Sequence, residues 1–319
     1  MILRALVADP LSEGGIEILR DGGGVDVVVR DAITPEGLLE TIPEFHALVV
    51  RSRTRVTREV LERGRLLRVV GRSGVGLDNI DVDAARERGV EIVYAPGASA
   101  VSVAELTIGL VICLSRRIHD ADRSTRAGLW ERTRLVGSEL SGKSLGILGL
   151  GNIGREVARR AAPFGMRILF HDPLRPRDAH LVPEAKEVPL TTLLASSDIV
   201  TVHVPLREET RHLLDAAAMG RMKRGAFLVN TSRGGIVDEG ALLAALRSGH
   251  VGGAALDVFE SEPPKGDALL DEPNVIATPH IGASTREAQE RVGREVARAV
   301  IRALRGSAKD REREVPKTR

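Results

Sequence analysis

The feature that most constrains the fold is a short apolar run followed by a G-x-G-x-x-G turn. Residues 144–150 fit a buried strand, and a helical pattern begins at Asn152, directly after the turn. In such a turn Gly149 permits the tight bend, Gly151 lets backbone N–H groups approach a ligand, and Gly154 lets the new helix pack on the strand. The helix N-terminus attracts an anion, so the turn predicts a site for a dinucleotide pyrophosphate.

An acidic residue stands where such a turn requires one. Asp172 ends the apolar run 166–171 and lies 18 residues after Gly154, close to the roughly 20-residue spacing of dinucleotide sites. A carboxylate at this place binds ribose hydroxyls and repels a 2′-phosphate, which favours NAD over NADP. Arg175 and Arg177 follow closely, and an arginine pairs with a 2′-phosphate, so the strictness of this preference stays open.

Length and charge limit the possible classes of protein. A chain of 319 residues is too long for one ordinary core, so we expect two domains. The net charge of +2 is nearly neutral and no basic block is interleaved with aromatic residues, so we expect no nucleic-acid partner. We also expect no membrane partner, because the longest apolar stretch, 106–114, is shorter than a membrane span of roughly 20 residues. The single Cys113 fits a protein of the reducing cytoplasm.

Short runs rich in Val, Ile and Leu alternate with helical patterns along the chain. Strands are predicted at 3–8, 25–29, 47–50, 68–70 and 91–94 and, after the glycine turn, at 167–170, 199–204, 226–230, 253–256 and 275–277. A long helix is predicted from 102 to 117, continuing to 126, and another from 285 to 304. Buried strands separated by helices are typical of parallel sheets covered on both faces. The predicted fold class is therefore α/β, with two doubly wound parallel sheets.

Three polar residues follow successive strands of the second predicted sheet: Arg233, Glu262 and His280. Loops at the carboxyl ends of parallel strands bind ligands in open α/β sheets, so we expect these side chains to converge. Imidazole is suited to take a hydroxyl proton, a neighbouring carboxylate favours the imidazolium form, and arginine offers a planar fork to a carboxylate. The set fits oxidation of an alcohol by hydride transfer, although each residue alone also fits an ordinary loop position.

Several motifs together resemble the D-2-hydroxyacid dehydrogenase family. They are 72–81 (RSGVGLDNID), 146–154 (GILGLGNIG), 230–239 (NTSRGGIVDE), 254–259 (AALDVF) and 279–285 (PHIGAST), and the resemblance covers roughly residues 1–305. It implies a Rossmann NAD domain, residues 98–285, inserted into a smaller flavodoxin-like substrate domain made of residues 1–97 and 286–319. It also implies that Arg, Glu and His form the catalytic set, with NAD as the cofactor and no metal.

The resemblance further implies binding roles for individual positions. Those that resemble cofactor contacts are Val75, Gly149, Gly151, Asn152, Ile153, Gly154, Asp172, His203, Val204, Pro205, Thr210, Thr231, Ser232, Arg233, Asp257, His280 and Gly282. Those that resemble substrate contacts are Arg51, Ser52, Arg53, Ser73, Gly74, Val75, Ser99, Arg233 and His280, with the backbone N–H groups of 73–75 facing a carboxylate. At Ser99 some members carry Asn, a longer side chain.

The substrate is the least constrained part of this interpretation. Arg51 and Arg53 flank one residue directly after a predicted strand and make a compact phosphate site, although a surface charge cluster has the same pattern. The chain resembles family members that oxidise 3-phospho-D-glycerate to 3-phosphohydroxypyruvate, the entry to serine synthesis, and the resemblance implies this reaction. The alternatives are reduction of glyoxylate, hydroxypyruvate or another 2-oxo acid and, as in related transcriptional corepressors, NAD(H) sensing without turnover.

The resemblance also bears on assembly and regulation. Family members are typically dimers or tetramers through their NAD domains, so we expect a homodimer or homotetramer in which Arg132 and Arg134 add positive charge to a neighbouring subunit's site. Some members carry a serine-sensing C-terminal domain. The chain ends soon after the helix at 285–304, so we expect no serine feedback through such a domain, and we expect 306–319 to be a frayed tail.

Overall fold

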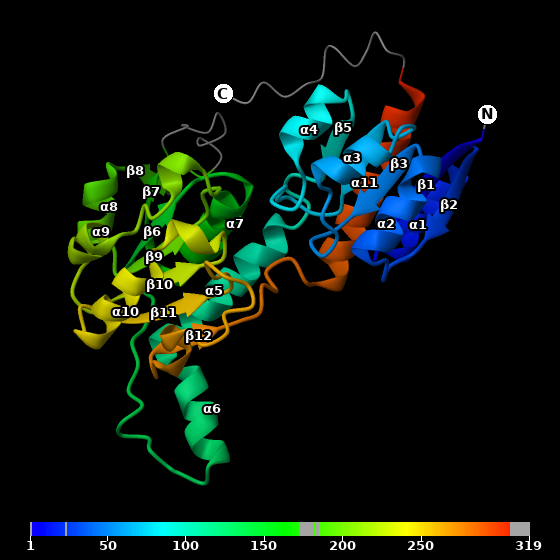
Figure 1. Cartoon of the computed structure of the whole chain (residues 1–319). Coiled ribbons are helices and arrows are strands. Elements are labelled where there is room, and N and C mark those ends of the chain that lie inside the picture. The colour runs from blue at the N-terminus through cyan, green and yellow to red at the C-terminus, as the bar shows by residue number, and fades with distance from the viewer. Residues whose placement is uncertain (1, 23, 173–181, 183–184, 307–319) are drawn as a thin grey trace. The chain divides into compact units, whose positions relative to one another are not determined.

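The chain divides into two compact units, Met1–Ser99 with Ser284–Arg319 and Ala100–Ala283. The computed structural model describes residues 2–22, 24–172, 182 and 185–306. Figure 1 shows that each unit contains its own sheet with helices packed against it.

The first unit is a five-stranded sheet with helices on both faces. Its elements are β1 (Leu3–Val7), α1 (Glu13–Asp21), β2 (Val25–Val29), α2 (Pro35–Thr41), β3 (Ala47–Val50), α3 (Arg58–Arg63), β4 (Val69–Arg72), α4 (Val82–Glu87), β5 (Glu91–Tyr94) and α11 (Arg286–Arg305). The strands are all parallel in the order β2-β1-β3-β4-β5, which is the flavodoxin-like order. The order reverses between β1 and β3, so the switch point lies at the carboxyl ends of these two strands.

The second unit is a seven-stranded parallel sheet. Its elements are α5 (Ala100–Arg116), α6 (Ile118–Arg126), β6 (Ser144–Leu148), α7 (Asn152–Ala161), β7 (Arg167–His171), β8 (Ala185–Glu187), α8 (Leu190–Ser196), β9 (Ile199–Val202), α9 (Ala216–Gly220), β10 (Ala226–Asn230), α10 (Glu239–Arg247), β11 (Val251–Leu256) and β12 (Val275–Ala277). The order β12-β11-β10-β9-β6-β7-β8 is that of a dinucleotide-binding fold with one added strand, and it reverses between β6 and β9. The predicted fold class is confirmed.

Alternating strand residues build a core on each face of both sheets. In the seven-stranded sheet Ile147 packs with residues of α5 and α7, whereas Leu148 packs with residues of α8, α9 and α10. In the five-stranded sheet Val7 packs against α1 and α11, whereas Leu6 packs against α2, α3 and α4. Successive side chains of a strand point to opposite faces, and both faces are covered, which explains why the strands are continuous apolar runs.

Short polar side chains fix where the helices begin. The N-cap residues whose side chains accept a backbone N–H from the first turn are Ser12, Thr34, Thr57, Asp81, Asp215, Asp238 and Thr285. Such caps stabilise a helix by about 1 kcal/mol each. Several of them follow a strand closely, so they end the loops at the carboxyl edges of the sheets.

The prediction of one long helix that begins at residue 102 and continues to residue 126 is wrong. It ends at Arg116, and α6 begins after Arg117, whose φ of 53° lies in the left-handed region. The Arg117 guanidinium binds Asp120 at 3.1 Å, and Asp120 is buried. Arginine has a high helix propensity. The sequence at this position therefore gives no sign of the break. Figure 1 shows α6 projecting away from the seven-stranded sheet.

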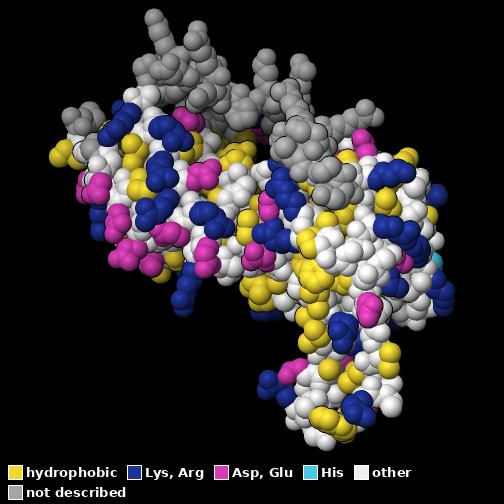
Figure 2. Space-filling view, turned by 180° about the vertical axis from the view of Figure 1, so that it is seen from behind, with side chains coloured by type: hydrophobic (Ala, Val, Ile, Leu, Met, Phe, Trp, Pro, Cys, Tyr) yellow, Lys and Arg dark blue, Asp and Glu magenta, His cyan; other side chains and the backbone are white. Residues whose placement is uncertain are grey.

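Two further observations describe the molecule as a whole. Figure 2 shows Lys and Arg side chains interspersed with Asp and Glu on the face in view. Within residues 2–22, 24–172, 182 and 185–306, no helix is both long enough and apolar enough to cross a membrane.

Candidate active site

The glycine turn joins β6 to α7 at the switch point of the second unit, and two of its glycines are required by the protein itself. Gly149 has a φ of +92°, and a Cβ there would lie 2.9 Å from the backbone of His203. A Cβ on Gly154 would lie 2.1 Å from the carbonyl oxygen of Gly149, far inside contact distance. Both glycines therefore serve the close approach of strand, turn and helix.

Gly151 differs from its two neighbours in the motif. Its φ of −69° suits any residue, and no described atom lies within 4 Å of the place that a Cβ would occupy. It is the N-cap of α7, so the open space lies before the first backbone N–H groups of a ten-residue helix, which have no acceptor within that helix. Nothing in the described chain requires glycine here, and the expected contact with a pyrophosphate stays a prediction.

Asp172 lies beside this turn. Its Oδ2 accepts a hydrogen bond from the backbone N–H of Leu150 at 2.8 Å, which ties the end of β7 to the glycine turn. Asn152 is exposed and its side-chain oxygen accepts from Arg155 at 2.8 Å, while Ile153 is half-buried. Arg175 and Arg177, which bear on the choice between NAD and NADP, lie outside the described residues.

The segment after β9 lines the other side of the switch point. Burial lowers the pKa of His203 to about 3, so its ring is neutral at physiological pH, and Nε2 contacts the Thr201 hydroxyl. Val204 is buried and Pro205 is exposed. The Thr210 hydroxyl donates to the carbonyl of Pro205 at 2.7 Å, which folds the segment back on itself. The expected cofactor contacts of these residues stay predictions.

The structure brings Glu262 and His280 together. His280 Nδ1 donates to Glu262 Oε2 at 2.8 Å, and both side chains are exposed by less than half. Glu262 Oε1 accepts from the backbone N–H of Phe259 at 3.3 Å. With Nδ1 hydrogen-bonded, His280 keeps Nε2 for a ligand. His280 has a φ of 51°, a left-handed conformation that is uncommon outside glycine and is concentrated at functional sites.

Asp257 holds the loop that carries His280. The carboxylate is buried at the end of β11 and accepts from the Thr278 hydroxyl at 2.6 Å. It also accepts from the backbone N–H groups of Ile281 and Gly282, at 2.8 Å each. The carboxylate thus accepts hydrogen bonds from residues on both sides of His280. The expected contact of Asp257 with a nicotinamide carboxamide stays a prediction.

Arg233 lies in the loop after β10, next to the Glu262 loop. Its Nη1 donates to the carbonyl of Ser232 at 2.7 Å, and Asn230 bonds to both ends of the turn. A Cβ on Gly234 would lie 1.9 Å from the carbonyl carbon of Phe259, so glycine lets the two loops touch. The Thr231 hydroxyl bonds to Thr107 of α5 at 2.9 Å, and the Ser232 hydroxyl donates to the carbonyl of Val204.

The sequence analysis missed Glu239 and Glu260, which join the same two loops. Glu260 N–H donates to Glu239 Oε1 at 2.7 Å, and Glu239 N–H donates to Glu260 Oε1 at 3.3 Å. Burial and the neighbouring carboxylates of Asp267 and Glu260 raise the pKa of Glu239 to about 7, against a backbone hydrogen bond from Glu260 that lowers it. Both glutamates stand in or beside the motifs 230–239 and 254–259, but those motifs give no sign of the pairing.

Asp9, also missed, organises the Arg51–Arg53 loop of the first unit. The buried Asp9 carboxylate at the end of β1 accepts from Arg51 N–H at 2.6 Å and from Arg53 Nε at 3.2 Å. It also accepts from the N–H and hydroxyl of Thr54. Ser52 is exposed, and the Arg51 guanidinium has no partner among the residues that the structure describes. The loop lies at the switch point between β1 and β3.

The loop after β4 differs from our expectation. The N–H groups of Ser73 and Gly74 donate to the carbonyls of Val50 and Arg72, at 2.7 and 2.8 Å. Of the three N–H groups expected to face a carboxylate, only that of Val75 has no acceptor within the described chain. Ser99 is buried in the turn before α5.

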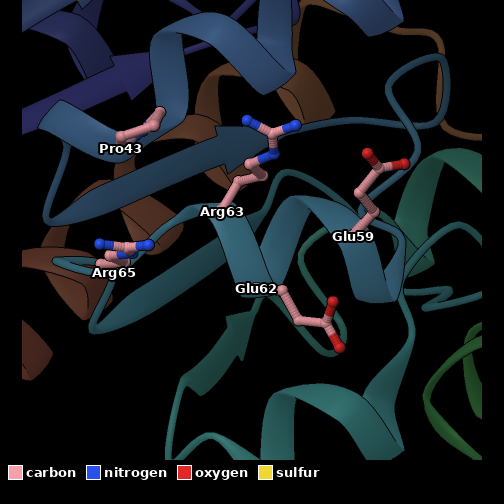
Figure 3. Close-up of a pocket in the computed structure, with 5 residues that line it drawn as sticks. All are labelled: Pro43, Glu59, Glu62, Arg63 and Arg65. Atoms are coloured by element: carbon pink, nitrogen blue, oxygen red, sulfur yellow. The ribbon is translucent and has the colours of Figure 1, made fainter.

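The cavity in Figure 3 is not formed by any of the predicted site residues. It measures about 390 Å³ and is lined by Pro43, Glu59, Glu62, Arg63 and Arg65 at α3. The labelled charged side chains point in different directions and do not converge on a ligand position. Over the described ranges, no three His, Cys, Asp or Glu side chains are grouped so as to hold a metal ion.

Residues 108–282 match the family model described as "D-isomer specific 2-hydroxyacid dehydrogenase, NAD binding domain". The chain belongs to this dehydrogenase family. The predicted resemblance and the prediction of NAD as cofactor are confirmed. The matched range contains the glycine turn, Arg233, Glu262 and His280.

Relatives within the dehydrogenase family carry different substrate names. A D-3-phosphoglycerate dehydrogenase of Methanocaldococcus jannaschii is 48% identical over 96% of this chain, which spans 58% of that relative's length. A hydroxypyruvate reductase of Thermotoga maritima is 46% identical over 94% of this chain and 98% of its own. The crystal structure of a glyoxylate reductase from Paecilomyes thermophila has a TM-score of 0.87 at 34% identity, covering 95% of both chains.

The two kinds of glycine in the dehydrogenase turn predict opposite defects. Gly151→Ala loses at most about 1 kcal/mol of stability, the cost of alanine at an N-cap, but fills the space before α7 and weakens NADH binding at least about tenfold, or 1.4 kcal/mol. Gly154→Ala loses about 1–3 kcal/mol because its Cβ meets the Gly149 carbonyl. Urea unfolding and fluorescence titration with NADH measure both. If the Gly151→Ala variant binds NADH as tightly as the wild type, this contradicts the prediction that the pyrophosphate lies in the space before α7.

Asp257→Asn is expected to disorder the His280 loop. It places an amide NH₂ where a buried carboxylate oxygen accepts backbone N–H groups, at a cost of about 1–3 kcal/mol. The control Thr278→Val removes one donor to the same carboxylate and leaves its backbone bonds intact. Urea unfolding should therefore show a smaller loss for Thr278→Val than for Asp257→Asn. The reverse order would show that the carboxylate does not anchor the loop.

Proposed function

We propose that the protein oxidises a D-2-hydroxy acid with NAD, using His280 as the general base. The observation that carries this proposal is the 2.8 Å hydrogen bond between His280 Nδ1 and Glu262, at strand ends of the unit that contains the glycine turn. A histidine whose Nδ1–H is held by a carboxylate presents a defined Nε2 to a substrate hydroxyl. Family membership supports the same chemistry.

Each residue has a separate task in this mechanism. Bound NAD supplies the hydride acceptor for C2 of the substrate. His280 Nε2 takes the hydroxyl proton, Glu262 stabilises the resulting imidazolium through Nδ1–H, and Arg233 orients the substrate carboxylate by its planar guanidinium. In the reverse direction the imidazolium returns the proton. Oxidation therefore requires neutral His280 and reduction requires the charged form.

We propose 3-phospho-D-glycerate as the substrate, oxidised to 3-phosphohydroxypyruvate in the first step of serine biosynthesis. Support comes from the likeness to D-3-phosphoglycerate dehydrogenases and from the Arg51–Arg53 loop, which lies at the switch point of the first unit. There the Asp9 carboxylate holds the loop by its backbone, while the guanidinium of Arg51 makes no bond to the described residues. That cation suits a phosphate.

A second candidate is reduction of hydroxypyruvate or glyoxylate by the same catalytic set. The likenesses to a hydroxypyruvate reductase and to a glyoxylate reductase favour it. Neither substrate carries a phosphate, so the Arg51 side chain decides between the two candidates. The third possibility, an NAD(H)-sensing binding protein, requires that the His280–Glu262 pair perform no turnover.

We propose that the protein acts as a dimer or tetramer, and that it works in the cytoplasm. The segment around α6 exposes large apolar side chains, with Trp130 79% and Val136 74% exposed. Figure 2 shows hydrophobic side chains on this projecting segment. An exposed apolar surface of this kind is typical of a protein interface, and a second copy through the NAD-binding unit fits it. Arg132 and Arg134 lie beside Trp130 in the same segment.

Replacing the catalytic base separates an enzyme from a binding protein. His280→Gln should lower kcat for NADH formation from 3-phospho-D-glycerate by about 10²–10⁴-fold, the usual contribution of a general base. The dissociation constant of NADH should change far less than kcat, because the glycine turn, which is expected to bind the pyrophosphate, is untouched. Initial-rate spectrophotometry and fluorescence titration measure the two quantities. Equal rates for wild type and variant would remove His280 from the mechanism.

Arg51→Ala tests the phosphate. Loss of a charge-assisted hydrogen bond of about 1.5–3 kcal/mol should raise KM for 3-phospho-D-glycerate about 10- to 100-fold, with little effect on KM for D-glycerate. Arg55→Ala is the matched control, since Arg55 is exposed on the same segment and has no partner in the described part of the chain. Arg53 is unsuitable because its removal unpairs the buried Asp9. An unchanged KM in Arg51→Ala would favour the unphosphorylated substrates.

A further inference from the structure

We propose that Glu239 and Glu260 are positioning residues that fix the Glu262 carboxylate against His280. They do this through a reciprocal pair of hydrogen bonds, which joins the loop after β10 to the loop after β11. The catalytic meaning of this inference rests on the proposed function, whereas the positioning itself can be tested without turnover.

The two bonds act as a clamp because each glutamate side chain accepts from the backbone of the other. Glu239 Oε1 receives the Glu260 N–H at 2.7 Å, and Glu260 Oε1 receives the Glu239 N–H at 3.3 Å. Glu239 is the first residue of α10, so its N–H has no acceptor within that helix. The clamp therefore ties an irregular loop to the start of a regular element.

The clamped stretch is the one that holds Glu262. The Phe259 N–H donates to Glu262 Oε1 at 3.3 Å, and Glu262 Oε2 accepts from His280 Nδ1 at 2.8 Å. The backbone of residues 259–260 also rests on Gly234, where a Cβ would lie 1.9 Å from the Phe259 carbonyl carbon. A continuous set of contacts thus runs from Glu239 through the Phe259–Glu260 backbone to the imidazole.

Other polar groups reinforce the clamp. His212 Nε2 lies 3.1 Å from Glu260 Oε1, and the His212 N–H donates to the carbonyl of Gly235 at 2.8 Å. Burial, and to a smaller extent a hydrogen bond shared with Asp267, raise the pKa of Glu239 to about 7. A protonated Glu239 still offers a carbonyl oxygen to the Glu260 N–H while its O–H donates to Asp267. Glutamine reproduces both bonds, so Glu239→Gln is the conservative variant.

The kinetic test compares Glu239→Ala with Glu239→Gln. Loss of the clamp should lower kcat about 10- to 100-fold, the size of effect that misplacement of a catalytic group by about 1 Å produces, with KM for NAD unchanged. Glu239→Gln should retain wild-type kcat. If Glu239 acts through Glu262, Glu239→Ala lowers kcat no further in a Glu262→Gln background. Equal kcat in wild type and Glu239→Ala, or additive losses in the double variant, would overturn the proposal.

The second readout needs no substrate. In protein with ¹³C-labelled histidine, the ring signal of His280 is identified by its absence in His280→Gln, and its chemical shift is compared between variants by NMR at one fixed pH. Glu239→Ala should move this chemical shift toward that of Glu262→Gln, because the carboxylate that is hydrogen-bonded to Nδ1 is displaced. Glu272→Ala is the control, since it removes the 2.7 Å pair between Glu272 and Arg247 of α10 without touching the catalytic loops.

The two readouts separate the two claims. A changed His280 chemical shift in Glu239→Ala, in a protein that turns over no 2-hydroxy acid, upholds the positioning and rejects the proposed function. A chemical shift that stays at the wild-type value in Glu239→Ala overturns the positioning, whatever the turnover. A chemical shift that moves equally in Glu272→Ala also overturns it, because the effect then reflects a general loss of packing around α10.

Discussion

A carboxylate at the end of one strand that holds the backbone of the neighbouring strand's loop is the interaction on which the candidate site depends. It occurs three times among the residues that the structure describes. Asp257 after β11 holds the loop after β12, Asp172 after β7 holds the turn after β6, and Asp9 after β1 holds the loop after β3. Hydrogen bonds to a charged group contribute about 1.5–3 kcal/mol each. Neighbouring loops of a parallel sheet are thereby fixed to one another where ligands bind.

The proposed catalytic pair, His280 and Glu262, shows why such anchoring is needed. His280 and Glu262 lie on different loops and are partly exposed, and an exposed ion pair alone contributes little stability. The geometry of the pair must therefore come from its supports: Asp257 on the histidine side and, in our proposal, Glu239 and Glu260 on the glutamate side. The glycines of the turn also have two different roles. Gly149 and Gly154 allow close packing, whereas the space beside Gly151 is open among the described residues.

Local patterns predicted most of the fold. Apolar runs located eleven of the twelve strands found among the described residues, and the parallel order follows from the alternation with helices. The short edge strand β8, with its charged sequence, had no such signal. The break at Arg117, where φ is 53°, also had no signal, because arginine has a high helix propensity. The sequence also placed Arg233, Glu262 and His280 at the ends of neighbouring strands, because that position depends only on where each strand stops.

The supports of the site were harder to predict because they are contacts between residues far apart in the chain. Asp9 binds the N–H of Arg51, and Glu239 binds the N–H of Glu260. Each is an ordinary acidic residue at a strand end or helix start, and only the strand order reveals its partner. In the loop after β4, the N–H groups of Ser73 and Gly74 bond to carbonyls of the protein itself, and the motif 72–81 gives no sign of this.

The central claim, that the strand-end set catalyses hydride transfer from C2 of a D-2-hydroxy acid, is tested most directly by isotope transfer. 3-Phospho-D-glycerate deuterated at C2 is incubated with the protein and NAD, and the NADH formed is analysed by mass spectrometry. The account predicts NADH that carries the deuterium. Formation of unlabelled NADH, or of none from this substrate or from any other deuterated D-2-hydroxy acid, would contradict it.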